Sequence, residues 1–224
     1  MTRSFSPRLD ALPPEQRRLW PELRPATDLG FVLYGGTAIA LRLGHRPSVD
    51  FDFFTEAPLD RQAIRARVPF MAGATVVQDA RDALGVLVPG SGGEHTHVKV
   101  SFFGGIDFGR VGVPERTDDG VLLVASLDDL MATKVKVVLQ RAEAKDYRDV
   151  ASMIRAGVSL ERGLASARAM FGEEFQPSES LKALVFFGDG DLRTLAEGDR
   201  STLVGAVRRV RGLPVVEIVS RRLG

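Results

Sequence analysis

Two aspartates, Asp50 and Asp52, stand one residue apart in the apolar run Val-Asp-Phe-Asp-Phe-Phe at residues 49–54. Aromatic and β-branched residues favour a strand here, and successive side chains on a strand point to opposite faces. The two carboxylates are therefore expected to share one face, with Phe51 and Phe53 on the other. Paired carboxylate oxygens suit Mg²⁺, or Mn²⁺, which takes them together with substrate phosphates. The alternative is an amphipathic edge strand whose acids are only solvated.

A glycine pair lies upstream of these acids, where a predicted strand at 31–34 gives way to a predicted helix at 37–43. Gly35 and Gly36 allow the backbone to approach an anion closely, and the N–H groups at a helix start attract phosphate. The Thr37 hydroxyl can donate to a phosphate oxygen or cap the helix. One helix and one loop join this turn to the aspartates, so a phosphate cradle beside a metal site is expected. A tight strand-to-helix turn with an N-cap threonine is the alternative.

A second charged block is KVKVVLQRAEAKDYRDV, residues 134–150. At about 100° per residue, Lys134, Arg141 and Lys145 fall within about 40° of one another on a continuous helix, with Asp149 about 60° from Lys134. We expect the three cations to bind a triphosphate or another polyanion. The alternative is an exposed face with i,i+4 ion pairs, but Arg141 and Lys145 carry like charges at that spacing.

The elements that must position these residues change in type along the chain. Residues 1–125 contain the β-type runs, and residues 126–224 are dominated by helix formers behind a Ser-x-x-Asp capping signal at Ser126. Beyond those named above, the pattern predicts strands at 74–78, 85–88 and 98–103, and helices at 15–23, 59–68, 127–141, 145–156, 159–171, 178–186 and 200–212.

The two charged blocks together resemble the AbiEii/AbiGii toxin family of the DNA polymerase β-like nucleotidyltransferase superfamily. The first block runs from Phe31 to Thr37, continues through twelve residues that contain Gly-His-Arg-Pro-Ser, and reaches Asp50 and Asp52. The second is similar to the family's downstream lysine motif and to its Lys/Arg-Asp-x-x-Asp motif.

This resemblance implies an α/β (α+β) fold, with a mixed-sheet nucleotidyltransferase core and N-terminal extension over residues 1–125. A helical region over 126–224 would complete the active site. The implied reaction is Mg²⁺-dependent transfer of a nucleoside monophosphate from an NTP to a hydroxyl of an RNA, such as tRNA, or of a protein. The implied partner is a separately encoded antitoxin, with this chain as the toxin of a toxin–antitoxin or abortive-infection pair.

The same resemblance assigns site residues. The catalytic set would be Asp50, Asp52, Lys134, Asp146 and Asp149, with Asp50 and Asp52 as metal ligands. The nucleotide and phosphate contacts would come from Gly35, Gly36, Thr37, Arg46, Ser48, Lys134, Arg141 and Lys145.

The predicted strand at 97–103 departs from the superfamily pattern, because Lys99 or Ser101 stands where members commonly hold a third acid. Either two metal carboxylates suffice, with Asp146 or Asp149 completing the site, or the chain is a nucleotide- or RNA-binding module on a degenerate core. A third possibility is a phosphohydrolase with an aspartate nucleophile, because Asp-x-Asp after an apolar strand also opens haloacid-dehalogenase sites.

Composition limits the remaining chemistry. The 224 residues include no cysteine, which excludes disulfides, thiolate zinc sites, iron–sulfur clusters and cysteine nucleophiles. Thirty Lys and Arg against 29 Asp and Glu give a net charge of +1, so nucleic-acid binding requires a local patch. No apolar run reaches the roughly 18 residues of a membrane span, and no leader is visible. A cytoplasmic protein without a membrane partner is expected.

Overall fold

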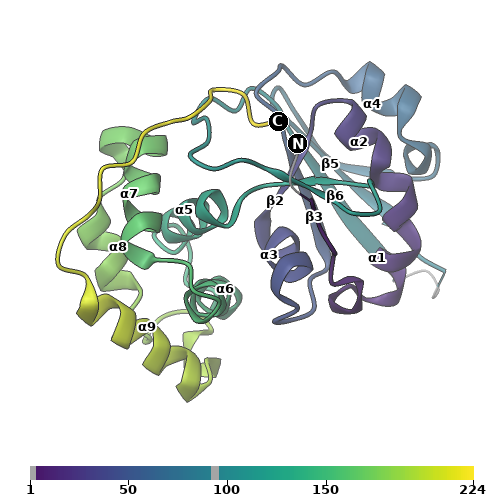
Figure 1. Ribbon diagram of the computed structural model, residues 1–224. Coiled ribbons are helices and arrows are strands. Elements are labelled where there is room, and N and C mark those ends of the chain that lie inside the picture. The colour runs from purple at the N-terminus through teal and green to yellow at the C-terminus, as the bar shows by residue number, and fades with distance from the viewer. Residues whose placement is uncertain (1–3, 92–95) are drawn as a thin grey trace. The chain divides into compact units, whose positions relative to one another are not determined.

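The computed structural model describes residues 4–91 and 96–224, and the chain divides into two compact units (Figure 1). The first unit comprises Met1–Gly109, Val113–Ala125 and Arg221–Gly224, and the second comprises Arg110–Gly112 and Ser126–Ser220. The predicted α/β class, with a mixed sheet ahead of a helical region, is confirmed.

The strands of the described residues form one mixed sheet in the order β1-β7-β8-β2-β3-β6-β5-β4. Near its centre, β2 runs antiparallel to β3, and β3 runs parallel to β6. The bounds are β1 Ser4–Phe5, β2 Val32–Tyr34, β3 Asp50–Phe54, β4 Thr75–Ala80, β5 Ala83–Pro89, β6 His97–Phe103, β7 Glu115–Thr117 and β8 Leu123–Val124. The sequence pattern did not predict β1 and β7, which are too short to show an alternation.

Helices cover both faces of this sheet, with α3 on one side and α1, α2 and α4 on the other (Figure 1). Their bounds are α1 Pro14–Leu19, α2 Arg24–Asp28, α3 Gly35–Leu43 and α4 Arg61–Arg67, and short 3-10 helices lie at Leu9–Ala11, Trp20–Leu23 and Pro69–Ala72. The core contains an aromatic cluster in which Phe102 contacts Phe31 and Phe53 at ring-centroid distances of 5.2 and 5.5 Å. Burial of each such ring contributes about 2–3 kcal/mol, which fixes β3 in the middle of the sheet.

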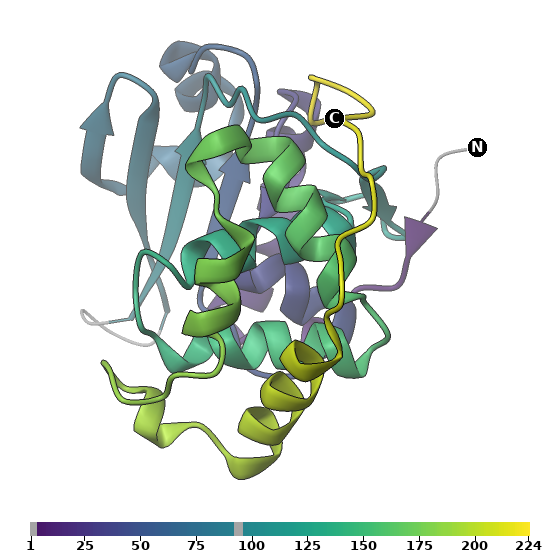
Figure 2. The ribbon, with the colours of Figure 1, turned by 90° about the vertical axis from the view of Figure 1, so that its left-hand side faces the viewer.

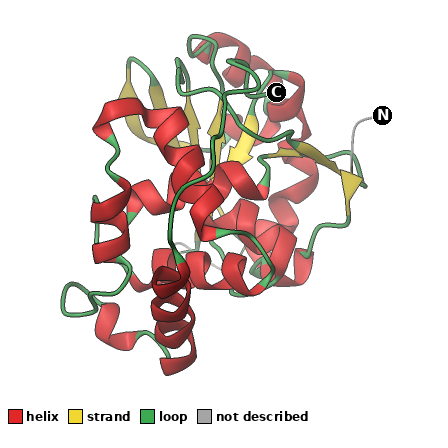
Figure 3. Ribbon diagram, turned by 60° about the vertical axis from the view of Figure 1, so that its left-hand side comes forward, coloured by secondary structure: helices red, strands yellow, loops and turns green. Residues whose placement is uncertain are grey.

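The second unit is built from helices and loops (Figure 3). The bounds are α5 Leu127–Val137, α6 Ala144–Arg155, α7 Leu160–Phe171, α8 Pro177–Ala183 and α9 Glu197–Arg209, with 3-10 helices at Gly172–Glu174 and Leu192–Thr194. Helix α5 starts at the predicted cap, because the Ser126 hydroxyl accepts a hydrogen bond from the Asp129 N–H at 3.1 Å. Helices α5 and α7 approach closely at Gly163, where a Cβ would lie 2.1 Å from the Met131 side chain.

The last part of the second unit, residues 210–220, follows these helices as a long loop (Figure 2). It is tied to the segment Arg110–Gly112 of the same unit, because the Arg110 N–H donates to the Ser220 carbonyl at 2.9 Å. Across the described residues, no helix combines the length and the apolar character that a bilayer crossing requires.

Candidate functional site

Strand β3 presents the two aspartates as the alternation predicts. Phe51 and Phe53 are fully buried, whereas Asp50 and Asp52 are half-buried on the opposite face. The aromatic side chains pin the strand from one side, so the carboxylates are fixed on a rigid element and remain accessible on the other. The predicted shared face is confirmed.

The neighbouring strand supplies no third acid on that face. Strand β6 pairs in parallel with β3 and sets Lys99 beside Asp50 and Ser101 beside Asp52. Paired residues on adjacent strands share a face, so the position where the superfamily commonly holds an acid carries an exposed cation and a buried hydroxyl. Within the described residues, no three or more histidines and acids gather as a metal-binding group. A metal here would take two protein carboxylates and complete its shell with other oxygens.

The glycine turn lies directly against the second aspartate. Gly35 has φ +76°, and a Cβ on it would lie 2.7 Å from the Asp52 carboxylate oxygen Oδ2. A side chain there would be strained in its backbone and would displace the carboxylate. Helix α3 begins at the same residue, and its first N–H groups have no partner within the helix. The N–H groups at the start of α3 and a carboxylate pair therefore meet where β2 ends.

Thr37 takes a different role from the two considered in the sequence. The helix N-cap is Tyr34, so Thr37 does not cap α3, and its side chain is buried. Its hydroxyl donates to the Asp50 carbonyl and lies 2.7 Å from the Ser48 hydroxyl. Ser48 is buried as well. Both hydroxyls thus tie α3 to the start of β3, and the protein already uses their hydrogen-bonding capacity.

Arg46 lies in the loop between α3 and β3. Its guanidinium Nη1 donates to the Pro47 carbonyl at 3.0 Å, and the side chain has further interactions. Its place in the loop, between α3 and the first aspartate of β3, is compatible with a phosphate contact.

In the second unit, Lys134 forms the centre of a buried ion cluster. Its ammonium Nζ lies 2.6 Å from Asp146 Oδ1 and 2.7 Å from Asp149 Oδ2. Both carboxylates are 0% exposed and the lysine side chain is 6% exposed. Arg141 completes the cluster with its Nε 2.8 Å from Asp146 Oδ2. Two cations and two carboxylates cancel in charge, which is the condition for burying them.

The pKa of Asp146 reflects this setting. Burial alone would raise it, but the charges and hydrogen bonds of Lys134 and Arg141 outweigh burial and hold the pKa below its ordinary value. Asp146 is therefore a carboxylate at neutral pH, and its oxygens accept from both cations.

The continuous helix on which the angles between these residues were based is wrong. Helix α5 ends at Val137 and α6 begins at Ala144, so Arg141 stands in the connection between them. The break allows Arg141 to fold back onto Asp146 on the first turn of α6. Lys145 does not join the cluster, because it is exposed and pairs with Glu143 at 2.8 Å. The sequence contains no strong helix-breaking residue between 138 and 143, which is why the pattern suggested continuity.

Two further residues anchor the connection between α5 and α6, and the sequence analysis missed both. Asp191 accepts a hydrogen bond from the Ala144 N–H at 2.6 Å and so satisfies the first turn of α6. Gly190 has φ +52°, and a Cβ on it would lie 2.0 Å from the Ala142 carbonyl oxygen. A Gly-Asp-Gly-Asp sequence at 188–191 indicates a loop, but a separation of 47 positions along the chain between Ala144 and Asp191 hides the contact.

Comparison with known proteins connects these features to a family. A family model described as "Nucleotidyl transferase AbiEii toxin, Type IV TA system" matches residues 18–212. An uncharacterized protein of Aquifex aeolicus (strain VF5) is 32% identical over 127 residues, which are 56% of this chain and 58% of that protein. The chain thus spans little more than half the length of this relative.

Among solved structures, the fold is similar to MenT4, a nucleotidyltransferase toxin from Mycobacterium tuberculosis H37Rv. The TM-score is 0.54 at 13% identity, over 86% of this chain and 82% of that one. At this identity the likeness concerns the fold. The family match covers most of the chain, including both charged blocks, and confirms the resemblance identified from the sequence. The chain belongs to the AbiEii nucleotidyl transferase toxin family of type IV toxin–antitoxin systems.

Proposed function

We propose that this protein is a metal-dependent nucleotidyltransferase that moves a nucleoside monophosphate from an NTP to a hydroxyl of an RNA, such as tRNA, or of a protein. The observation that carries the proposal is the meeting of the Gly35 turn with Asp52, beside Asp50 on the same face of β3. Membership in a family of nucleotidyl transferases supports this reaction over hydrolysis through an aspartate nucleophile.

Asp50 and Asp52 would hold the metal, Mg²⁺ or Mn²⁺. Two half-buried carboxylates on a rigid strand suit a hard cation that takes one or two carboxylates together with nucleotide phosphates. Once bound, such an ion neutralises charge on the phosphate oxygens. The chain's own part is to fix the carboxylates: Phe51 and Phe53 anchor the strand from below, and Thr37 holds the Asp50 carbonyl.

The backbone N–H groups of Gly35 and Gly36 would contact the phosphate tail, because they open helix α3 next to the carboxylates. Thr37 and Ser48 support this turn as positioning residues, since their hydroxyls bond to each other and to β3. Arg46, in the loop that follows α3, is a candidate for an additional phosphate contact.

In the helical unit, Arg141 is the better candidate for a phosphate contact than Lys134. Its side chain is 45% exposed, whereas that of Lys134 is 6% exposed and lies between two carboxylates. We assign Asp146 and Asp149 to holding Lys134 and Arg141 in place, since both carboxylates accept ion pairs from these cations. Lys145 remains a candidate for a peripheral contact because it is exposed.

The biological setting proposed is a type IV toxin–antitoxin pair, with this chain as the toxin and a separately encoded antitoxin as its partner. Transfer to tRNA or to a protein hydroxyl would act where NTPs and these acceptors are found, in the cytoplasm.

The direct test uses each of the four α-³²P-labelled NTPs with Mg²⁺ or Mn²⁺, total tRNA and total protein. Covalent label is expected on one acceptor class and is expected to vanish in the double variant Asp50→Asn/Asp52→Asn. The matched control is Asp28→Asn, which removes an exposed acid elsewhere in the same unit. Label that persists in the double variant would overturn the proposal.

A second candidate, a nucleotide- or RNA-binding module without transfer, is favoured by Lys99 and Ser101 beside the aspartates. It is separated by the same experiment, since such a module would bind an NTP or RNA and leave every acceptor unlabelled.

A further inference from the structure

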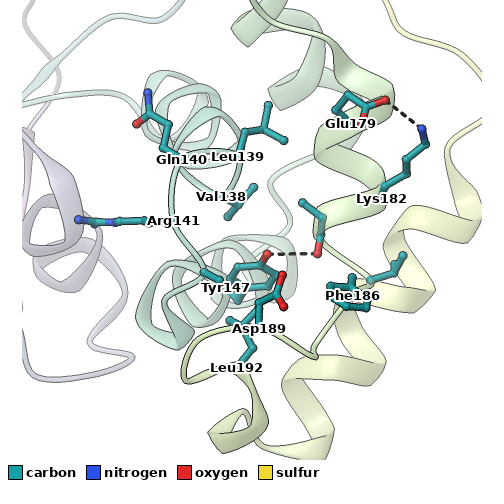
Figure 4. Close-up of a pocket in the computed structure, with 13 residues that line it drawn as sticks. Val138, Leu139, Gln140, Arg141, Tyr147, Glu179, Lys182, Phe186, Asp189 and Leu192 are labelled. Atoms are coloured by element: carbon teal, nitrogen blue, oxygen red, sulfur yellow. Dashed lines mark hydrogen bonds and ion pairs between the residues drawn. The ribbon is translucent and has the colours of Figure 1, made fainter.

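A cavity of about 710 Å³ lies within the helical unit, and Arg141 of the Lys134 ion cluster forms part of its wall (Figure 4). Its walls come from the connection after α5, from α6, and from the end of α8 with the loop that follows. Much of the lining is apolar: Val138, Leu139, Val185, Phe186 and Leu192 all take part. Leu139, Val185 and Phe186 are each at least 39% exposed, an unusual concentration of large apolar side chains at one opening.

Of the charged groups that line the cavity, one acid has no ion-pair partner in the described part of the chain. Glu179 and Lys182 pair with each other at 2.9 Å. Arg141 is bound to Asp146, and in Figure 4 its side chain extends away from the other labelled residues. The exposed carboxylate of Asp189 has no ion pair or side-chain hydrogen bond within the described part of the chain. The lining thus holds two cations and two acids, and Asp189 is the one of these four charges without an ion-pair partner among the residues that the structure describes.

The backbone adds negative potential to that of Asp189. Helix α5 ends at Val137, immediately before the lining residue Val138, and α8 ends at Ala183, which itself lines the cavity. The carbonyl end of a helix carries a partial negative charge that favours a cation nearby. Burial raises the pKa of Tyr147, which lines the cavity, and the charges of Asp189 and Asp146 raise it further.

The cavity is preformed by the loop at residues 186–191. Gly190 packs against the Ala142 carbonyl, and Asp191 bonds to the Ala144 N–H. On the opposite side, the Tyr147 hydroxyl donates to the Ala183 carbonyl at 3.2 Å and links α6 to the end of α8 (Figure 4). A cavity that is already formed binds a ligand without the free-energy cost of a conformational rearrangement.

We propose that this cavity is a second binding site, for an amine or guanidinium group carried on an apolar body. The apolar part lies along Leu139, Val185 and Phe186, and the cation faces Asp189 and the two helix carbonyl ends. Both a free organic amine and an arginine or lysine side chain of a peptide have this chemistry. Asp189 and Phe186 have no part in the nucleotidyl transfer proposed above, although Arg141, the candidate phosphate contact, forms part of the cavity wall.

The test is a ¹H–¹⁵N NMR titration of the full chain with phenethylamine, with 2-phenylethanol as the uncharged analogue. The amine is expected to shift the amide signals of Tyr147, Ala183 and Asp189, and to bind about fivefold more tightly than the alcohol. Equal affinity for the two compounds, or shifts confined to other parts of the chain, would overturn the proposal.

Two variants in the cavity and one control variant test whether the preference for the amine arises at this site. Asp189→Asn is expected to remove the preference for the amine and leave binding of the alcohol unchanged, whereas Glu217→Gln, an exposed acid of the same unit outside the cavity, leaves both unchanged. Phe186→Ala is expected to weaken both compounds. Because both cavity side chains are exposed, the variants should fold, and an Asp189→Asn protein that keeps the preference would contradict the assignment.

A parallel titration distinguishes the two sources of the cation. The probes are acetyl-Leu-Arg-Leu-amide and its glutamine counterpart, acetyl-Leu-Gln-Leu-amide. Arginine-dependent binding of the peptide supports a side chain of a protein partner as the ligand. Binding of phenethylamine without binding of the peptide supports a free amine.

Discussion

The protein holds two pairs of aspartates in opposite ways. Asp50 and Asp52 lie two apart on a strand and are half-buried, with an aromatic core behind them. Asp146 and Asp149 lie three apart on a helix, are fully buried, and accept ion pairs from Lys134. Each spacing puts both carboxylates on one face of its own element. The same chemical group is thus left accessible in one unit and neutralised by the protein itself in the other.

This difference separates a binding site from a structural cluster. A half-exposed carboxylate pair can be reached by an incoming cation, whereas a fully buried, ion-paired one has its charge committed to the fold. We therefore expect the β3 pair to govern activity with little effect on stability. The α6 pair should govern stability first.

The largest effect is expected when the central cation is removed. Lys134→Met removes the cation that contacts both buried carboxylates, Asp146 and Asp149, and should lower the free energy of unfolding by about 3–5 kcal/mol. Urea unfolding followed by circular dichroism measures it. Lys145→Met is the matched control, since this exposed lysine pairs only at the surface and its loss should change stability by less than about 0.5 kcal/mol. Equal losses in the two variants would show that the buried cluster is not what stabilises the unit.

A smaller effect is expected at the glycine turn. Gly35→Ala introduces a Cβ at φ +76° and 2.7 Å from Asp52 Oδ2, so it should destabilise the chain by about 1–3 kcal/mol and reduce nucleotide transfer by moving the carboxylate. Gly73→Ala in the same unit meets open space at φ −114° and should change neither quantity. Thermal unfolding and the labelling assay report the two effects. Full nucleotide-transfer activity in Gly35→Ala would show that the turn is not part of the active site.

The smallest expected effect is the dependence of the free energy of unfolding on pH. Because the pKa of Asp146 is held below its ordinary value, the folded protein binds fewer protons at this carboxyl than the unfolded chain does. Its stabilisation is therefore complete above the unfolded pKa of about 3.9 and is lost as the pH falls through that value towards the folded pKa. Wild-type protein should lose more stability between about pH 5 and about pH 3 than Asp146→Asn does. Parallel urea-unfolding curves for the two proteins would contradict this.

The sequence was sufficient for the elements with a regular pattern. The alternation of Asp50, Phe51, Asp52 and Phe53 gave the strand and the face of each side chain, and Ser126 marked the start of α5. It also placed Lys99 and Ser101 on the strand next to the aspartates. In these cases the information lies in neighbouring residues, because strand alternation and helix capping are local.

The remaining contacts depend on residues distant in sequence or on ambiguous local preferences. The first of the two predicted helices was carried to residue 141, beyond the end of α5 at Val137, because residues 138–143 contain neither glycine nor proline. Asp146 and Asp191 stabilise the connection from outside. The role of Thr37 was missed for a similar reason. Its hydroxyl contacts Ser48 and the Asp50 carbonyl, which only the packing of α3 against β3 brings within reach.

The central claim is that Asp50 and Asp52 form the metal–nucleotide site. The most direct measurement is Mn²⁺ binding, followed by electron paramagnetic resonance, in the presence of each non-hydrolysable NTP analogue. Wild-type protein should bind Mn²⁺ together with one of these nucleotides, and Asp50→Asn/Asp52→Asn should lose this binding while its unfolding free energy stays within about 1 kcal/mol of the wild type. Undiminished Mn²⁺–nucleotide binding by the folded double variant would contradict the account.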